Sequence, residues 1–169
     1  MELGADTCHF FPGLPLDGSL ASEALASALD AFFLRSFTGR WRSDTFAALA
    51  AGMRGEDLAL LRDESSGAVV GFARIYDGAS PALGPGMYWR ELMGSSPGAL
   101  GPIGVDEGRR GLGLGLALLR LCLEELARRG VRTMVIDWTD LGAFYAKMGF
   151  KSWKRYRLCS KLLARTKAS

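Results

Sequence analysis

The segment GRRGLGLGLALL, residues 108–119, places two arginines and alternating glycines at the start of an apolar helical pattern. A helix N-terminus exposes unpaired backbone N–H groups and carries about half a positive charge, so it attracts anions. Glycine lets a phosphate approach the backbone because it has no Cβ. Close packing of a helix on a strand would not require so many glycines. We therefore predict a phosphate-binding turn at 111–115, to which Arg109 and Arg110 add positive charge.

Two common nucleotide-binding motifs do not fit this turn. The dinucleotide fingerprint G-x-G-x-x-G needs a third glycine, but Leu116 stands at that position after Gly111 and Gly113. The P-loop needs a lysine after its last glycine, and Leu114 follows Gly113 instead. The phosphate group is therefore expected to belong to a different class of ligand.

Hydrolase and metal chemistry find less support in the residues. The segment GSSPG, 94–98, matches the G-x-S-x-G pattern of a hydrolase, but Pro97 and Gly98 prevent the helix that must follow the serine. The only histidine, His9, lies far upstream beside Cys8. A zinc site needs four ligands, and no second pair accompanies these two residues, so no metal site is predicted.

Composition and length limit the classes of protein to which the chain can belong. A chain of 169 residues, 49% hydrophobic and 23% charged, is typical of one soluble domain with a sizeable core. The longest apolar stretch, 112–123, contains Arg120 and is too short to span a bilayer. The first residues show no secretory signal. Three widely spaced cysteines, Cys8, Cys122 and Cys159, indicate reduced thiols and a cytoplasmic location.

The end of the chain is strongly basic. Residues 141–169 contain eight lysines or arginines and no acidic residue, although the whole chain has a net charge of only +3. Nucleic-acid binding is one interpretation. The preferred interpretation is a strand and tail that are exposed to solvent. A third interpretation, intermediate between these two, is a basic edge that helps to hold an anionic ligand.

Hydrophobic spacing and turn residues predict the elements. They follow in this order: a helix over 19–37, a helix over 44–53 capped by Ser43, a hairpin of 57–64 and 68–78, a loop over 77–98, a strand over 100–105, the glycine turn, a helix over 116–129, a strand over 131–137, a short helix over 140–148 and a last strand over 150–159. A strand, a helix and a second strand in this order imply parallel pairing of 100–105 with 131–137. The expected fold class is α/β, a mixed and mostly antiparallel sheet with helices on both faces.

Two motifs together resemble one family. Arg110, Gly113 and Gly115 match [QR]-x-x-G-x-[GA], and FYAKMGF, 144–150, matches F-Y-x-x-x-G-F at the expected distance. Both are motifs of the GNAT superfamily of acyl-CoA-dependent N-acyltransferases. The resemblance covers residues 99–157, and the IDWT stretch that begins at Ile136 is similar to a group of bacterial GNAT domains. It implies a single GNAT domain, in which 1–98 carry the N-terminal elements and the acceptor-side loop, 99–157 the acyl-CoA core and 158–169 a basic tail.

The resemblance also implies how acetyl-CoA binds. In this superfamily the CoA pyrophosphate lies on the backbone N–H groups of the glycine turn, which here are those of Gly111, Leu112, Gly113, Leu114 and Gly115, with Arg110 beside them. The pantetheine arm pairs with the fourth strand, here Ile103, Gly104 and Val105, which splays from the fifth. Pro102 agrees with an unpaired edge, because proline cannot donate to a ladder.

The roles in catalysis follow from the same likeness. Tyr145 is expected to protonate the leaving thiolate, although its place on an apolar helix face is also explained by packing. The acidic residue that many relatives carry before Val105 is absent, and Asp137 is the candidate base; capping of the next helix explains it equally well. Glu91, Asp77 or a chain of water molecules remain as alternative bases.

The acceptor side is expected in the long loop. Tyr88 and Trp89 are candidate walls of an amine pocket, although aromatic residues in long loops also serve to pin the loop.

The predicted function is transfer of an acetyl group from acetyl-CoA to a primary amine, by direct attack in a ternary complex. The alternative is an inactive acyl-CoA-binding domain that acts as a sensor or partner module. The expected partners are acetyl-CoA and an amine-bearing small molecule or peptide, with no membrane and no nucleic acid. The identity of the amine and the oligomeric state, a homodimer included, stay open.

Overall fold

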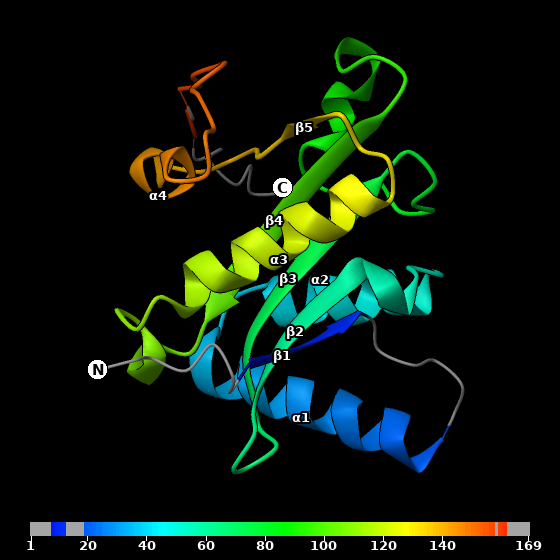
Figure 1. The fold of residues 1–169 in the computed structure, drawn as a ribbon, viewed down its shortest axis with the longest axis vertical. Helices are drawn as coiled ribbons and strands as arrows, with labels where there is room; N and C mark the ends of the chain where they lie inside the picture. Colours follow the sequence, from blue (N-terminus) through cyan, green and yellow to red (C-terminus); the bar gives the residue numbers. More distant parts are fainter. Residues whose placement is uncertain (1–7, 13–18, 158, 162–169) are drawn as a thin grey trace, which may run out of the picture. The chain divides into compact units, whose positions relative to one another are not determined.

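The computed structural model describes residues 8–12, 19–157 and 159–161 (Figure 1). The chain divides into two compact units, Met1–Thr139 and Asp140–Ser169. The expected division into 1–98, 99–157 and 158–169 stays a prediction. Within the described part of the chain, no helix is long and apolar enough to cross a membrane.

The first unit contains one twisted sheet of five strands in the order β1-β2-β3-β4-β5. Its strands are β1 (Cys8–Pro12), β2 (Leu58–Asp63), β3 (Val69–Asp77), β4 (Pro97–Val105) and β5 (Thr133–Val135). The pairs from β1 to β4 are antiparallel, and β4 and β5 are parallel. The mixed, mostly antiparallel sheet is thus confirmed. The first strand was not expected from the sequence, and it carries Cys8 and His9 at the edge of the sheet.

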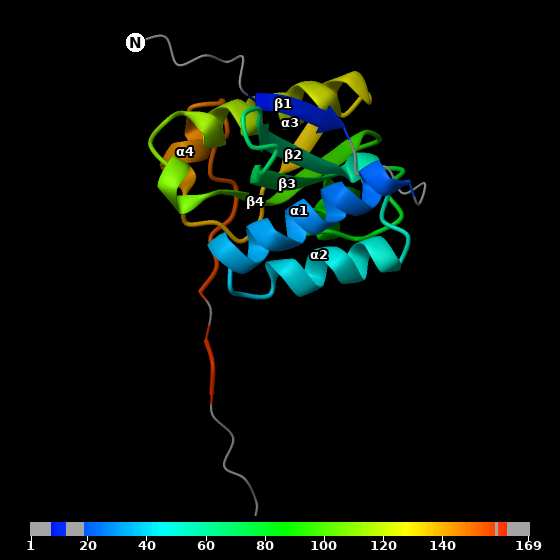
Figure 2. The same ribbon diagram turned by 90° about the horizontal axis from the view of Figure 1, so that it is seen from below.

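Helices cover both faces of this sheet, as expected (Figure 2). The helices α1 (Leu20–Ser36) and α2 (Trp41–Ala50) lie on one face, and α3 (Leu114–Arg128) lies on the other. The predicted apolar stripe of α1 is fully part of the core: Leu25, Leu29, Phe32 and Phe33 are all buried. The α1 helix begins after Ser19, whose hydroxyl oxygen accepts a hydrogen bond from the Ser22 amide.

The second helix begins earlier than predicted. It starts at Trp41 with Arg40 as its N-cap, and no side chain caps it. Ser43, the expected cap, lies inside the helix and donates its hydroxyl to the Arg40 carbonyl oxygen at 2.9 Å. The expectation for Ser43 was therefore wrong. The ring of Trp41 packs against that of Phe37, and the helix begins at Trp41 because of this contact.

The far end of α3 is fastened to the sheet by a buried ionic cluster. Arg129 lies 2.6 Å from Asp57, 3.1 Å from Asp77 and 2.7 Å from Glu125, measured between side-chain nitrogen and oxygen atoms. Arg54 binds the same two aspartates. These contacts fix the direction in which α3 leaves the glycine turn.

The second unit contains the short helix α4 (Gly142–Ala146), which lies inside the predicted range 140–148. The predicted last strand over 150–159 is wrong for the described residues, since 150–157 form no strand. Alternating aromatic and basic side chains favour an extended chain, but a strand also needs a neighbour that accepts and donates its hydrogen bonds.

Candidate functional site

The strands β4 and β5 separate soon after they meet. Their ladder pairs Pro97 with Thr133, Gly98 with Met134 and Ala99 with Val135, and no later pair is formed in the described chain. The predicted pairing of 100–105 with 131–137 was therefore correct in direction but wrong in register. Because β4 stays paired with β3 as far as Val105, the edge of 100–105 that faces away from β3 has no strand partner in the described residues.

A bulge in β4 explains the separation. Ala73 pairs with Ile103 but Ile75 pairs with Leu100, so Gly101 and Pro102 together stand opposite the single residue Arg74. A bulge bends the strand that contains it. Pro102 also removes one backbone donor at this point. The sequence therefore builds a strand, 103–105, that leaves β5 and keeps a free backbone edge.

The glycine turn follows this free edge directly. A 3-10 helix, η4 (Glu107–Arg109), leads to Gly111 and Gly113, whose φ angles are 80° and 81°, and Gly113 is the N-cap of α3. Such φ values favour glycine. A Cβ at either position would meet no atom within 4 Å, so the outer side of the turn is bare.

The backbone amides of the turn are available to a ligand. Within the described part of the chain, the N–H groups of residues 111–115 donate no hydrogen bond to any protein acceptor. Five unpaired amides at the start of a fifteen-residue helix make a site for an anion. The glycine spacing predicted bare amides at this helix start, and the binding of a phosphate to them stays a prediction.

Asp106 anchors the start of the turn to α1. Its carboxylate accepts hydrogen bonds from Arg35 Nε at 2.9 Å and from the Ser36 hydroxyl at 3.1 Å. Partial burial opposes ionisation, but these two hydrogen bonds outweigh it and lower the pKa of Asp106. The start of the turn is thus held by an ionised side chain that is bound to α1.

The two arginines before the turn have different surroundings. Arg109 forms an ion pair with Asp63 at the end of β2. Hydrogen bonds from Ser65 and Ser66, together with that from Arg109, hold the pKa of Asp63 well below its usual range. Arg110 is 55% exposed and its guanidinium lies 3.8 Å from Glu107. Both arginines thus have a carboxylate neighbour, but the contact of Arg110 is longer and more exposed, so Arg110 is the more available of the two to an anion. The sequence had suggested that both arginines add charge to the site.

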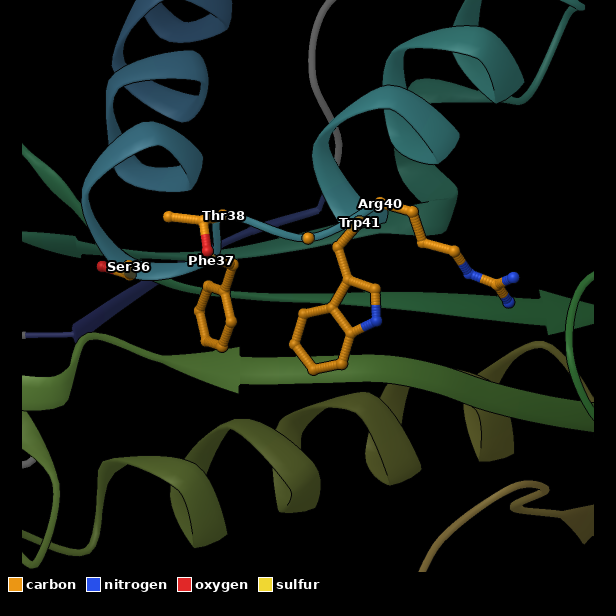
Figure 3. A pocket seen from close by; sticks show the side chains of 6 residues that line it. Ser36, Phe37, Thr38, Arg40 and Trp41 are labelled. Atoms are coloured by element: carbon orange, nitrogen blue, oxygen red, sulfur yellow. The ribbon is translucent and has the colours of Figure 1, made fainter. Parts of the chain in front are cut away.

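A pocket of about 340 Å³ lies at the connection of α1 and α2 and is lined by Ser36, Phe37, Thr38, Gly39, Arg40 and Trp41 (Figure 3). The rings of Phe37 and Trp41 point toward the sheet, whereas the Arg40 side chain extends away from them. A Cβ at Gly104 of β4 would lie 2.5 Å from the Phe37 ring and 3.1 Å from the Trp41 ring. The pocket was not expected from the sequence. Its signal was Gly104, since a glycine inside a strand marks the close approach of another group.

Asp137 is held at the point where the strands separate. It lies two residues after Val135, the last paired residue of β5. Its carboxylate accepts a hydrogen bond from Trp89 Nε1 at 3.2 Å and another from the Trp138 backbone amide at 2.9 Å. The alternative role as a cap is not seen, because α4 has Leu141 as its N-cap and no side-chain cap.

The two aromatic residues expected on the acceptor side have different environments. They lie in the 3-10 helix η3 (Met87–Leu92). Tyr88 is 67% exposed, whereas Trp89 is half-buried against the cluster of Tyr76, Met87, Met93 and Ala99. Trp89 therefore pins the loop as well as reaching Asp137.

The two alternative bases have different surroundings. Asp77 is buried and bound by Arg54 and Arg129. Burial opposes its ionisation, but hydrogen bonds from Arg54 and the Ala79 amide lower the pKa of Asp77. It also pairs with Gly98, at the opposite end of β4 from Val105. Glu91 is exposed and lies 3.4 Å from Arg90.

Tyr145 is a buried residue of α4 in the second unit. Its ring lies 5.0 Å from the Phe144 ring and 6.1 Å from the Phe150 ring, between centroids. The three aromatic residues of the FYAKMGF motif thus form one cluster. The packing role that the sequence allowed for Tyr145 is real, and the catalytic role remains a prediction.

Comparisons with known proteins identify the family. The model of the Acetyltransferase (GNAT) family matches residues 25–150. A region of a fungal multi-domain GH3 β-N-acetylglucosaminidase, described as a GCN5-related glucosamine N-acetyltransferase, is 24% identical with a TM-score of 0.72. That match covers 87% of this chain and 17% of the fungal chain. A comparison of the sequence with curated proteins finds no match.

Two bacterial structures are also similar in fold. The Escherichia coli GNAT family N-acetyltransferase YhbS, in complex with CoA, is 22% identical with a TM-score of 0.60, covering 86% of this chain and 69% of that chain. A GNAT family acetyltransferase from Brucella melitensis, in complex with acetyl-CoA, is 23% identical with a TM-score of 0.56. The match covers 86% of this chain and 83% of the Brucella chain. At these identities the likeness concerns the fold.

Proposed function

Because the chain belongs to the GNAT family of acetyltransferases, we propose that it transfers an acetyl group from acetyl-CoA to a primary amine. One observation carries the proposal: the unpaired amides of residues 111–115 follow, after the short connection 106–110, a strand, 103–105, whose edge is free. A diphosphate needs the first feature and a pantetheine amide needs the second. The similar structures with CoA or acetyl-CoA bound support this choice of ligand.

The acyl donor would lie along this strand and turn. Gly111, Leu112, Gly113, Leu114 and Gly115 would donate their amides to the pyrophosphate, and Arg110 would add a charged contact. Ile103, Gly104 and Val105 would pair with the pantetheine arm in place of a neighbouring strand. A backbone N–H of this strand would also stabilise the oxyanion that forms on the thioester carbon.

Direct transfer needs two proton movements. The nitrogen lone pair attacks the thioester carbon, the C–S bond breaks, and the sulfur leaves with a proton. We assign that proton to Tyr145, because a phenol with an ordinary pKa near 10 is protonated at neutral pH. We assign removal of the amine proton to Asp137, because its carboxylate is held at the separation of β4 and β5 by Trp89 and the Trp138 amide.

Transfer through a covalent cysteine intermediate is not favoured at Cys122. This thiol is buried, and burial raises its pKa to about 12. A thiolate is needed for attack on a thioester, and a buried thiol with such a pKa supplies almost none. The ternary-complex route therefore agrees better with the residues of the first unit.

The acceptor would approach beside Tyr88 and Trp89. Because Trp89 is engaged with Asp137, Tyr88 is the more accessible of the two residues. A cytoplasmic location and the possibility of a homodimer belong to the same proposal. Neither is needed for the chemistry.

An inactive acyl-CoA-binding domain is the second candidate. It is motivated by the absence of a carboxylate in 99–104, the segment before Val105. The two candidates are separated by measuring thiol release from acetyl-CoA with a panel of amines, next to calorimetric binding of CoA. We expect amine-dependent thiol release. Tight CoA binding without turnover on any amine would support the binding module instead.

A further inference from the structure

Arg74 is a buried cation without a carboxylate partner in the described chain. It lies in β3 and only 7% of the residue is exposed. Among the described residues, its side chain makes one hydrogen bond, from Nη1 to the Asp44 backbone carbonyl at 3.3 Å. Its Nε atom is buried and has no partner among the described residues. The Thr45 hydroxyl next to Asp44 is also buried and without a partner there.

This environment is costly for a charge. Burying an ion without a counter-ion is strongly unfavourable, and buried charges in proteins are normally paired. Arg129 at the end of α3, whose side chain is 9% exposed, follows that rule with three carboxylates. An arginine of this kind is explained if its counter-ion arrives with a ligand.

The contacts of Arg74 connect it to the helix that begins at the α1–α2 pocket and, through the ladder, to the bulge of β4. Its contact Asp44 and the neighbouring Thr45 lie one helical turn after Trp41, which lines the pocket. Phe72, two residues before Arg74 and thus on the same face of β3, has its ring centroid 5.8 Å from that of Trp41. The bulge residues 101–102 stand directly opposite Arg74 in the ladder.

We propose that Arg74 receives an anionic group of the acetyl acceptor, so that the acceptor is an amine that also carries a carboxylate or phosphate, such as an amino acid. This inference rests on the proposed function and names its substrate class. The guanidinium binds the anion with charge-assisted hydrogen bonds, and the Thr45 hydroxyl supplies a further donor. Phe37 and Trp41 contact the remaining part of the molecule, and the bulge places the anion close to the reacting carbon.

The experiment compares amines that differ only in the anionic group. Tyrosine against tyramine and lysine against cadaverine test a carboxylate, and glucosamine 6-phosphate against glucosamine tests a phosphate. Binding of each is measured by calorimetry in the presence of CoA, and KM and kcat are measured with acetyl-CoA. The variants are Arg74→Met, which keeps the volume without the charge, and Arg74→Gln, which keeps a donor for the Asp44 carbonyl. Arg42→Met is the control, since it removes an exposed cation of α2 that pairs with Asp30.

We expect the wild type to bind the anionic member of at least one pair about 10- to 100-fold more tightly, the range of a charge-assisted pair. Arg74→Met and Arg74→Gln remove that preference and leave the KM for acetyl-CoA unchanged, whereas Arg42→Met keeps it. If Arg74→Met does not fold, the binding measurements on Arg74→Gln test the proposal.

Equal binding of both members of every pair, or a preference that survives the loss of Arg74, would overturn the proposal. Turnover of uncharged amines alone would leave the acetyltransferase function standing without it. Arg74-dependent binding of the anionic amines without any turnover would support the anion site and contradict the acetyltransferase function.

Discussion

Gly113 allows the phosphate-binding turn to be tested apart from the stability of the fold. Its φ is +81° at the N-terminal end of α3, and Gly130 has a φ of +86° just after the C-terminal end of the same helix. A Cβ at either glycine meets nothing within 4 Å. Alanine at either position therefore introduces the same backbone strain, about 1–2 kcal/mol, and no clash.

The expected effects follow from this match. For a chain of this length, a loss of about 1–2 kcal/mol lowers the melting temperature by about 2–8 °C, and we expect Gly113→Ala and Gly130→Ala to behave alike in thermal unfolding. Calorimetry of CoA binding well below that temperature should separate them. Gly113→Ala weakens binding at least about tenfold, because its methyl group occupies the side on which the diphosphate approaches the amides. Wild-type affinity in Gly113→Ala, or an equal loss in both variants, would refute the reasoning.

Four further variants have defined outcomes. Tyr145→Phe lowers kcat at least about 100-fold with little change in the KM for acetyl-CoA, if the phenol is the acid; an unchanged kcat removes it from the mechanism. Arg110→Ala weakens acetyl-CoA binding about tenfold by calorimetry. Arg109→Ala, whose side chain is engaged with the end of β2, lowers the melting temperature and leaves the affinity within about twofold. Hydrogen bonds from Arg128, opposed by partial burial, lower the pKa of Glu125 to about 2. Since the pKa is lower in the folded than in the unfolded state, this stabilisation is present above about pH 4.3 and is lost as the pH falls toward 2. Urea unfolding across that range should show the decline in the wild type and a weaker decline in Glu125→Gln.

Local patterns predicted most of the fold. The apolar spacing in 19–37 and the Ser-Ser-Gly turn between the two hairpin runs depend on neighbours in sequence, and both elements formed as expected. The strand β1 was missed because CHFFP has only five residues and no regular alternation of apolar and polar side chains. Its strand character comes from pairing with β2, some fifty residues away. The strand expected over 150–159 failed for the opposite reason, since its pattern was right and no partner is formed by the described residues.

The features of the candidate site were also predicted where they involve neighbours in sequence and missed where they do not. The glycine turn could be predicted because its chemistry is contained in five consecutive residues. The hydrogen bond from Trp89 to Asp137 joins residues 48 positions apart, and the environment of Arg74 depends on α2 and the bulge of β4. Such contacts are set by the packing of the sheet and its helices, which no single stretch of sequence specifies.

The most direct test of the account is a crystal structure of the protein with acetyl-CoA. We expect the diphosphate oxygens within hydrogen-bonding distance, about 2.7–3.2 Å, of amide nitrogens between Gly111 and Gly115, and the pantetheine arm beside 103–105. A fully occupied acetyl-CoA molecule bound elsewhere, with those amides left without a ligand, would contradict it.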